Sequence, residues 1–270
     1  MSSKDYANGR RPDAAPAALL SVEGVTVRFG GVTALDGVRF NVAPGQICGL
    51  IGPNGAGKTT LFNCISRLYT PSAGEIRFEG EPLSRVPRHR IAKLGVARTF
   101  QNLALFATMS VRENVRVGAH AFARGGFLAQ ALALPLARAE EREIAGLADA
   151  LIDECRLSDV ADRLVGELPF GVKKRVELAR ALAISPKLLL LDEPAAGLNH
   201  EEVDALASEI VRLRDARRLS VLLVEHHMNL VMRVSDQVVA LDFGRLIADG
   251  TPASVRAHPE VVRAYLGAAA

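Results

Sequence analysis

Apolar and polar residues alternate along the first part of the chain, as they do in strands with one buried face. Residues 21–28 and 38–42 both alternate, and Gly30-Gly31 lies between them. Residues 74–80 form a third short segment of strand-forming residues bounded by glycines. The pattern predicts a small antiparallel sheet near the N-terminus.

Short, largely apolar runs of strand length follow at residues 46–51, 187–191 and 220–224. Such runs suit parallel strands that are buried on both faces of a sheet. Apolar residues recur with helical spacing over 172–184, and again after Asn199, which can cap a helix between the last two runs. Parallel strands that alternate with helices predict an α/β fold.

Other segments predict smaller elements around these strands. The run Ser110-Val111-Arg112-Glu113 has the form of a capping box that opens a helix, and residues 140–156 also look helical. A hairpin is predicted over residues 236–248, and a helical tail over residues 251–266. The alanine-rich segment 121–138 is broken by glycines and a proline and matches no single element.

Composition excludes several classes of protein. The chain is 49% hydrophobic and 23% charged, which is ordinary for a globular protein. No apolar run approaches the roughly 20 residues that cross a bilayer as a helix. Three widely spaced cysteines without a C-x-x-C pair predict neither a disulfide framework nor a zinc site. The net charge of +3, without a strong basic stripe, predicts no nucleic-acid partner.

The two ends of the chain differ in their expected order. Residues 1–18 are rich in alanine, proline and polar residues, so we expect a disordered tail rather than a signal peptide. Residues 19–270 are expected to form a single domain in the cytoplasm, with a mostly helical subdomain over about 102–185.

The run GPNGAGKTT at residues 52–60 fits the phosphate-loop pattern G-x-x-x-x-G-K-[ST]. It follows a predicted strand and precedes a segment that can continue as a helix, which is the structural context that the pattern requires. Glycines let backbone N–H groups close around phosphate oxygens, and a helix N-terminus adds a partial positive charge. Lys58 can reach the β- and γ-phosphates, and the Thr59 hydroxyl can ligate Mg²⁺. The predicted ATP-binding residues of this phosphate loop are Gly52, Pro53, Asn54, Gly55, Ala56, Gly57, Lys58, Thr59 and Thr60.

A second motif follows the run of four leucines at residues 188–191. Asp192 and Glu193 stand at the end of this predicted strand. An Asp there, beside the phosphate loop, can hold Mg²⁺ through water, and the adjacent Glu can polarise an attacking water. Together the two motifs predict a nucleotide-hydrolysing site.

With these motifs the chain resembles an ATP-binding-cassette (ABC) ATPase over about residues 20–268. Gln101, in Arg98-Thr99-Phe100-Gln101, matches the Q-loop, which contacts Mg²⁺ and faces the membrane partner. The run 195–199 matches the D-loop, His226 matches the switch histidine, and Phe29 matches the aromatic residue that stacks on adenine.

The resemblance implies a P-loop ATPase fold of the ABC type, a mixed sheet with an antiparallel β-subdomain and a helical subdomain. It implies ATP and Mg²⁺ as cofactors. The catalytic residues it implies are Lys58, Glu193 and His226, and the Mg²⁺ ligands are Thr59, Gln101 and Asp192.

Four runs are more specific than the superfamily. Residues 98–106, 192–199, 225–232 and 258–267 resemble the larger ATPase subunit of branched-chain amino-acid importers. That resemblance implies a peripheral subunit at the cytoplasmic face of the membrane. Its implied partners are a second ATPase subunit, two transmembrane permease subunits and, through the complex, an extracytoplasmic solute-binding protein.

Related cassettes leave other cargoes open: import of urea, short amides or aromatic acids, or export of lipopolysaccharide. A cassette acting on nucleic acid or ribosomes is the other class of function. Such relatives usually carry paired cassettes, zinc inserts or long coiled coils, and none of these stands in the 270 residues.

The chain departs from the family at the signature loop, which usually reads Leu-Ser-Gly-Gly-Gln and contacts ATP bound to the other subunit. The aligned residues here are Leu168, Pro169, Phe170, Gly171 and Val172. Pro169 supplies neither a hydroxyl nor an N–H. One lost charge-assisted hydrogen bond would cost about 1.5–3 kcal/mol. A homodimer would place Pro169 over both ATP molecules, so we expect a heterodimer whose partner brings the stronger signature.

Overall fold

The structure is a computed structural model of the 270-residue chain, and it describes residues 18–100, 103–120 and 135–267. The predicted N-terminal tail, except for residue 18, lies outside the described residues. So do Gln101 and most of the segment 121–138. The division into a tail, one domain and a helical subdomain therefore stays a prediction.

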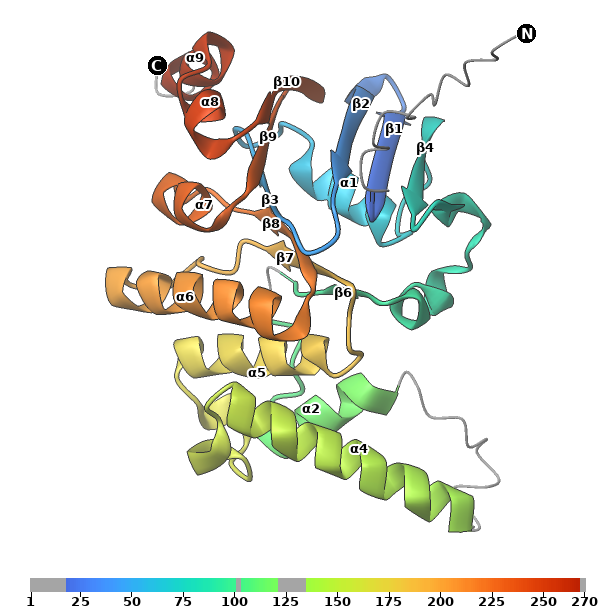
Figure 1. The fold of residues 1–270 in the computed structure, drawn as a ribbon, viewed down its shortest axis with the longest axis vertical. Helices are drawn as coiled ribbons and strands as arrows, with labels where there is room; N and C mark the ends of the chain where they lie inside the picture. Colours follow the sequence, from blue (N-terminus) through green and yellow to red (C-terminus); the bar gives the residue numbers. More distant parts are fainter. Residues whose placement is uncertain (1–17, 101–102, 121–134, 268–270) are drawn as a thin grey trace, which may run out of the picture.

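A six-stranded sheet forms the centre of the molecule, in the order β10-β9-β3-β8-β7-β6 (Figure 1). Its strands are β3 (Ile47–Ile51), β6 (Val96–Arg98), β7 (Leu188–Asp192), β8 (Ser220–Val224), β9 (Gln237–Asp242) and β10 (Arg245–Gly250). Neighbouring strands from β6 to β9 are parallel, and β10 pairs antiparallel with β9. Every residue of β3, β7 and β8 is buried, as the apolar runs predicted.

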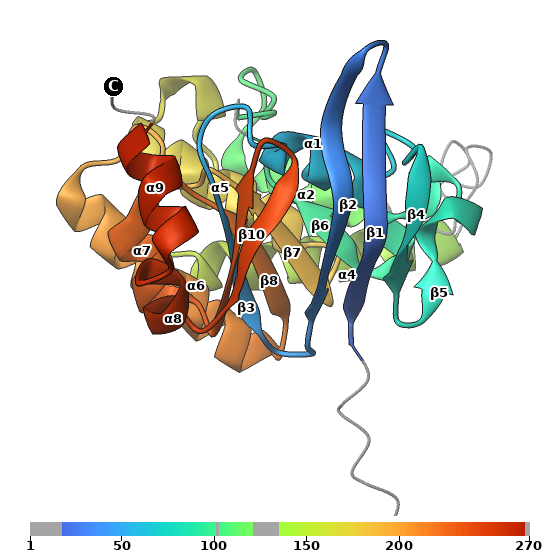
Figure 2. The ribbon, with the colours of Figure 1, turned by 90° about the horizontal axis from the view of Figure 1, so that it is seen from above.

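The second sheet is antiparallel and four-stranded, in the order β2-β1-β4-β5. Its strands are β1 (Leu20–Phe29), β2 (Val32–Val42), β4 (Ala73–Phe78) and β5 (Glu81–Pro82). Strand β2 begins six residues before the predicted start at residue 38, because its antiparallel pairing with β1 runs back to Val32. Helix α1 (Lys58–Ile65) packs between the two sheets, where Leu61 and Phe62 are fully buried (Figure 2).

Three helices pack on one another below the central sheet in Figure 1: α2 (Val111–Ala119), α4 (Pro135–Glu154) and α5 (Phe170–Leu182). Helix α6 (His200–Arg217) lies between α5 and the sheet, and its buried residues join the same apolar core. The remaining α-helices are α7 (Met228–Val234), α8 (Pro252–Arg256) and α9 (Pro259–Gly267). Short 3₁₀ turns cover Leu83–Arg85, Arg88–Arg90, Ala92–Leu94, Ser158–Val160 and Val165–Glu167.

The predicted α/β class, mixed sheet and antiparallel β-region are confirmed. The predicted capping box at Ser110 and Glu113 forms, and the predicted cap Asn199 forms a second one with Glu202. The predicted helical tail is two helices rather than one, because a residue before proline disfavours helical backbone and α9 begins at Pro259. The three cysteines are buried and free. Within the described ranges, no helix is long and apolar enough to span a membrane.

Candidate active site

The phosphate loop fits closely against the strands around it. Gly52 has φ 149° and Gly57 has φ 100°, conformations that favour glycine. A Cβ at Gly52 would lie 2.2 Å from the carbonyl oxygen of Leu241, and one at Gly57 would lie 2.6 Å from that of Ala34. Both glycines are therefore required by close backbone contacts, which fix the loop at the N-terminus of α1. The first N–H groups of a helix have no partner within it, so this N-terminus can donate hydrogen bonds to a phosphate.

Lys58 lies across this loop. Its Nζ donates hydrogen bonds to the carbonyl oxygens of Gly52, at 2.6 Å, and Pro53, at 2.9 Å. Burial lowers the pKa of Lys58, and the nearby carboxylates of Glu193 and Asp192 oppose that shift. The ammonium is thus held beside the carboxylates, where it can exchange a carbonyl partner for a phosphate oxygen.

The other loop residues form the rim. Asn54 and Gly55 are exposed, Ala56 is buried, and Thr59 and Thr60 follow in the first turn of α1. A cavity of about 530 Å³ separates residues 53–56 from the C-terminal helix α9.

Helix α9 also contacts the loop directly. The N–H of Gly52 donates a hydrogen bond of 2.9 Å to the Tyr265 hydroxyl. Burial raises the pKa of Tyr265, and this hydrogen bond opposes the shift. The residues of the phosphate-loop motif give no sign of this contact. Tyr265 lies in the run 258–267, which resembles the importer subunit but assigns the tyrosine no role.

Asp192 ends β7 and is buried together with an unpredicted partner, Arg98. The Arg98 guanidinium donates to the Asp192 carboxylate at 2.7 Å and to the Asn63 side chain of α1 at 2.8 Å. It also lies over the rings of Phe62, at 5.5 Å, and Phe100, at 5.3 Å. Strand β6 puts Arg98 next to β7, and because β6 was not predicted this neighbour was missed.

The residues present fit Mg²⁺ bound together with nucleotide. The described residues hold no cluster of three or more His, Cys, Asp or Glu side chains able to bind a metal ion. Mg²⁺ is commonly held by one or two carboxylates and substrate phosphates rather than by a cage of protein ligands. The Asp192 carboxylate and the exposed Thr59 side chain supply that kind of donor set. The third predicted ligand, Gln101, is outside the described ranges.

Glu193 and His226 meet at the ends of the adjacent parallel strands β7 and β8. The His226 Nε2 and Glu193 Oε1 atoms are 2.7 Å apart, although the residues are 33 positions apart in the chain. Glu193 has φ 49°, and its N–H donates to the Val224 carbonyl oxygen at 2.9 Å. This turn aims the carboxylate toward the histidine. The structure thus brings together Glu193 and His226, two of the three residues predicted to be catalytic, and places Glu193 near the third, Lys58.

A buried carboxylate behind this pair escaped sequence analysis. Glu225 is 1% exposed, and its carboxylate accepts hydrogen bonds from the N–H groups of Ala195, at 2.6 Å, and His226, at 3.0 Å. It therefore ties the residues after Glu193 to the histidine. In the sequence, only the position of Glu225 directly before His226 could have indicated its role.

Phe29 stands at the end of β1, where its side chain remains 46% exposed. The ring meets Tyr69 edge to face, with centroids 5.2 Å apart and an interplanar angle of 72°. An exposed aromatic face of this kind can stack on a flat ligand. The stacking on adenine stays a prediction.

The signature loop, residues 168–172, begins helix α5. Pro169 is the N-cap, and its carbonyl oxygen accepts from the N–H groups of Val172 and Lys173. Leu168 is buried. A Cβ at Gly197 would meet the Phe170 ring at 3.0 Å, so the loop packs on residues 195–199. In the described residues, no hydrogen bond joins the signature loop to the phosphate loop of the same chain.

Comparison with known proteins agrees with this fold. The family model described as ABC transporter matches residues 35–196. A solved ATP-binding cassette of an ABC transporter in its ADP conformation has a TM-score of 0.81 at 30% identity, and the match covers 93% of this chain and 99% of that one. The chain belongs to the ABC transporter ATP-binding proteins, which are ATPases that hydrolyse ATP to drive transport.

Within that family the chain is of the branched-chain amino-acid type. A model described as branched-chain amino acid ATP-binding cassette transporter matches residues 245–270. The chain is 45% identical to the high-affinity branched-chain amino acid transport ATP-binding protein BraF of Pseudomonas aeruginosa. It is 41% identical to LivG of Escherichia coli, which has the same description. Each match covers 93% of this chain and 98% of the relative.

Proposed function

We propose that this chain is the ATP-hydrolysing subunit that energises import of branched-chain and other hydrophobic amino acids, at the cytoplasmic face of a membrane. The observation that carries the proposal is the meeting of Lys58, Asp192 and the Glu193–His226 pair at one edge of the sheet, in a chain 45% identical to BraF.

Each residue of this edge has a role that follows from its position. Glu193 orients, or takes a proton from, the water that attacks the γ-phosphate, and the hydrogen bond to His226 holds that carboxylate. Lys58 and the loop N–H groups stabilise the transferring phosphoryl group, and Phe29 stacks on adenine. Thr59, Asp192 and Gln101 would hold Mg²⁺ that arrives with the nucleotide, and the ion would supply positive charge against the phosphates.

A heterodimer is the assembly that best suits Pro169. The N-terminus of α5 and Gly171 remain available to ATP bound to a partner, but Pro169 offers no side-chain hydrogen bond there. A second ATPase subunit with a stronger signature would complete the site built on residues 52–60. Two transmembrane permease subunits and an extracytoplasmic solute-binding protein complete the proposed importer.

Uptake in the native cells tests the function. Glu193→Gln is placed in the chromosomal gene, and Lys93→Met serves as an exposed control. We expect uptake of labelled leucine, isoleucine and valine to fall to background in the first strain only. Unchanged uptake of all three, with loss of urea or aromatic-acid uptake, would reassign the cargo.

Affinity capture from detergent-solubilised membranes tests the assembly. Recovery of two different membrane subunits and a second ATPase subunit is expected. Comparing Glu193→Gln with the equivalent change in the partner then tests the asymmetry. If the partner's change abolishes turnover and Glu193→Gln does not, the active site is the one built on the partner's phosphate loop.

A further inference from the structure

A cavity of about 310 Å³ lies between α5 and α6, apart from the phosphate loop. The two helices run side by side in Figure 1, and apolar side chains from both line the space. The main ones are Val172, Leu178, Leu206 and Ile210, and Leu198 joins them from the turn before α6. The volume is at the lower end of the roughly 300–1,000 Å³ that is typical of ligand pockets.

Lys174 lines this apolar cavity and is 92% buried, with 8% of its surface exposed. Its Nζ is fully covered, and no hydrogen-bond acceptor for it occurs in the part of the chain that the structure describes. Its nearest aromatic contact is the Phe170 ring, with Nζ 5.5 Å from the centroid. The Lys174 charge opposes the burial-driven rise in the pKa of Glu177, so that carboxylate is near, but it gives the ammonium no hydrogen bond. A buried ammonium without a hydrogen-bond acceptor is unfavourable, and an anionic or carbonyl oxygen in the cavity would relieve the cost.

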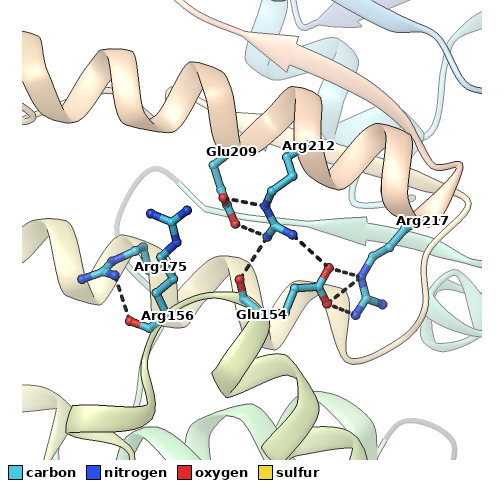
Figure 3. A network of polar contacts seen from close by, with 6 residues as sticks. All are labelled: Glu154, Arg156, Arg175, Glu209, Arg212 and Arg217. Atoms are coloured by element: carbon cyan, nitrogen blue, oxygen red, sulfur yellow. Dashed lines mark hydrogen bonds and ion pairs between the residues drawn. The ribbon is translucent and has the colours of Figure 1, made fainter.

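The carboxylates around the cavity already accept hydrogen bonds from other groups. Glu177 accepts from the Phe100 N–H at 2.9 Å, and Glu202 accepts from the Asn199 N–H at 2.9 Å. Glu209 is paired with Arg212 at 2.6 Å (Figure 3).

Of the two arginines that line the cavity, Arg156 is exposed and Arg175 is engaged. Arg175 donates to the carbonyl oxygen of Arg156 at 2.9 Å, a contact also drawn in Figure 3. Among the polar groups that line the cavity, the Lys174 ammonium is therefore the buried donor left for a ligand.

We propose that this cavity binds a small aliphatic carboxylic acid. The hydrocarbon body fills the space between the apolar walls of α5 and α6, and the carboxylate accepts hydrogen bonds from Lys174 Nζ. Charge-assisted hydrogen bonds of this kind are stronger than neutral ones, so the acid is favoured over an uncharged molecule of the same shape.

The position of the cavity gives such a ligand a way to affect ATP turnover. Pro169 and Gly171 of the signature loop line it on one side, and Pro194 and Leu198, which follow Glu193, line it on the other. A bound acid would contact both segments and fix their separation, which changes the ATPase rate of the assembled transporter. This regulatory step depends on the proposed function, whereas the binding step does not.

Calorimetry with the purified full chain tests the binding. The probes are 4-methylpentanoate and its uncharged amide, 4-methylpentanamide. We expect the acid to bind one to one and the amide to bind at least tenfold more weakly. Lys174→Met should weaken binding of the acid at least tenfold, because the ammonium is lost and most of the volume is kept. Lys93→Met, an exposed site with the same change of charge, should bind like the original chain.

A second variant covers the case in which Lys174→Met fails to fold. Ala205→Trp fills the rim of the cavity from α6 and should abolish binding of the acid. The proposal is overturned if the acid gives no heat with the original chain, or if the acid and the amide bind equally. It is also overturned if a folded Lys174→Met or Ala205→Trp variant keeps the affinity.

The regulatory step is tested separately in the captured transporter. Addition of 4-methylpentanoate should change the ATPase rate in the original complex and leave it unchanged with Ala205→Trp. An unchanged rate in the original complex, despite binding, rejects the regulatory step alone. Failure of the proposed cargo appears instead in the leucine-uptake assay.

Discussion

Two regions of the molecule are held in place in different ways. The nucleotide edge is defined as the phosphate loop, Asp192 and Glu193. The loop and Glu193 directly follow fully buried strands, Asp192 ends one of these strands, and close backbone contacts fix Gly52 and Gly57. The helix junction is defined as the contacts of Glu154, Arg156, Arg175, Glu209, Arg212 and Arg217. Its long side chains join α4 to α6, and α5 to the segment that follows α4 (Figure 3). Most of those side chains remain partly exposed.

The difference teaches where the molecule is rigid and where it is adjustable. Buried strands and tight glycine contacts leave the catalytic groups few alternative positions. Partly exposed ion pairs contribute little each and are screened by salt, so the junction can rearrange at small cost. Substitutions at the nucleotide edge should therefore remove chemistry and preserve the fold, whereas those at the junction should change stability more than chemistry.

The largest effect is expected for Lys58→Ala. The variant loses the ammonium that faces the transferring phosphoryl group, so kcat/KM for ATP should fall on the order of 10³-fold. Steady-state ATPase assays of the assembled transporter measure this loss, and a thermal melt serves as the control for folding. An ATPase rate within tenfold of the original would contradict the proposed role of the phosphate loop.

Glu193→Gln should lower kcat on the order of 10²-fold, the low end for removal of a general base. The KM for ATP should change little, because the phosphate loop is untouched. The amide can still hydrogen-bond to His226 but cannot take a proton from water. A large rise in KM with unchanged kcat would mean that Glu193 helps to bind nucleotide instead.

The nucleotide edge could be predicted from sequence because its signals are local. The glycine spacing around Lys58 and the leucine run before Asp192 each specify a strand and the turn that follows it. Strand β6 has only three residues, too few for a periodic pattern, so the contact of Arg98 with Asp192 could not be derived. The Gly52–Tyr265 contact spans 213 positions, and no motif residue indicates it.

The junction could not be predicted, for a different reason. Arg212, Arg217 and Glu154 stand on helices whose charged residues all satisfy the same amphipathic pattern, so the pattern does not show which ones pair. The Arg217–Glu154 pair joins residues 63 positions apart, and it depends on where the C-terminal end of α4 lies relative to α6. The cavity beside it depends on side-chain packing, which single-sequence patterns do not describe.

A smaller effect at the nucleotide edge is expected for Tyr265→Phe. The change removes the hydroxyl that accepts from Gly52 N–H and keeps the ring, at a cost of about 0.5–1.5 kcal/mol. We expect KM for ATP to rise about two- to tenfold with kcat nearly unchanged. Tyr69→Phe is the matched control, because it removes a hydroxyl outside the loop and keeps the ring that contacts Phe29. Equal kinetics for both variants would show that the α9 contact does not position the loop.

The smallest effect is expected at the junction, for Arg217→Gln. Arg217 is the first cause of the lowered pKa of Glu154, and burial of the carboxylate opposes it. Because the folded pKa is below the unfolded value of about 4.3, this stabilisation is fully present above pH 4.3. It is lost as the pH falls through the folded pKa. At pH 7 the variant should be about 1 kcal/mol less stable, since the pair is half-buried and Arg212 remains beside Glu154.

Urea unfolding at pH 7 and at acidic pH measures this difference. The free energies of unfolding of the original chain and Arg217→Gln should converge as Glu154 takes up its proton. Arg256→Gln, an exposed arginine on α8, should match the original chain at both pH values. A difference that persists undiminished in acid would mean that Arg217 stabilises the junction by packing. The helix junction would then be as rigidly held as the nucleotide edge.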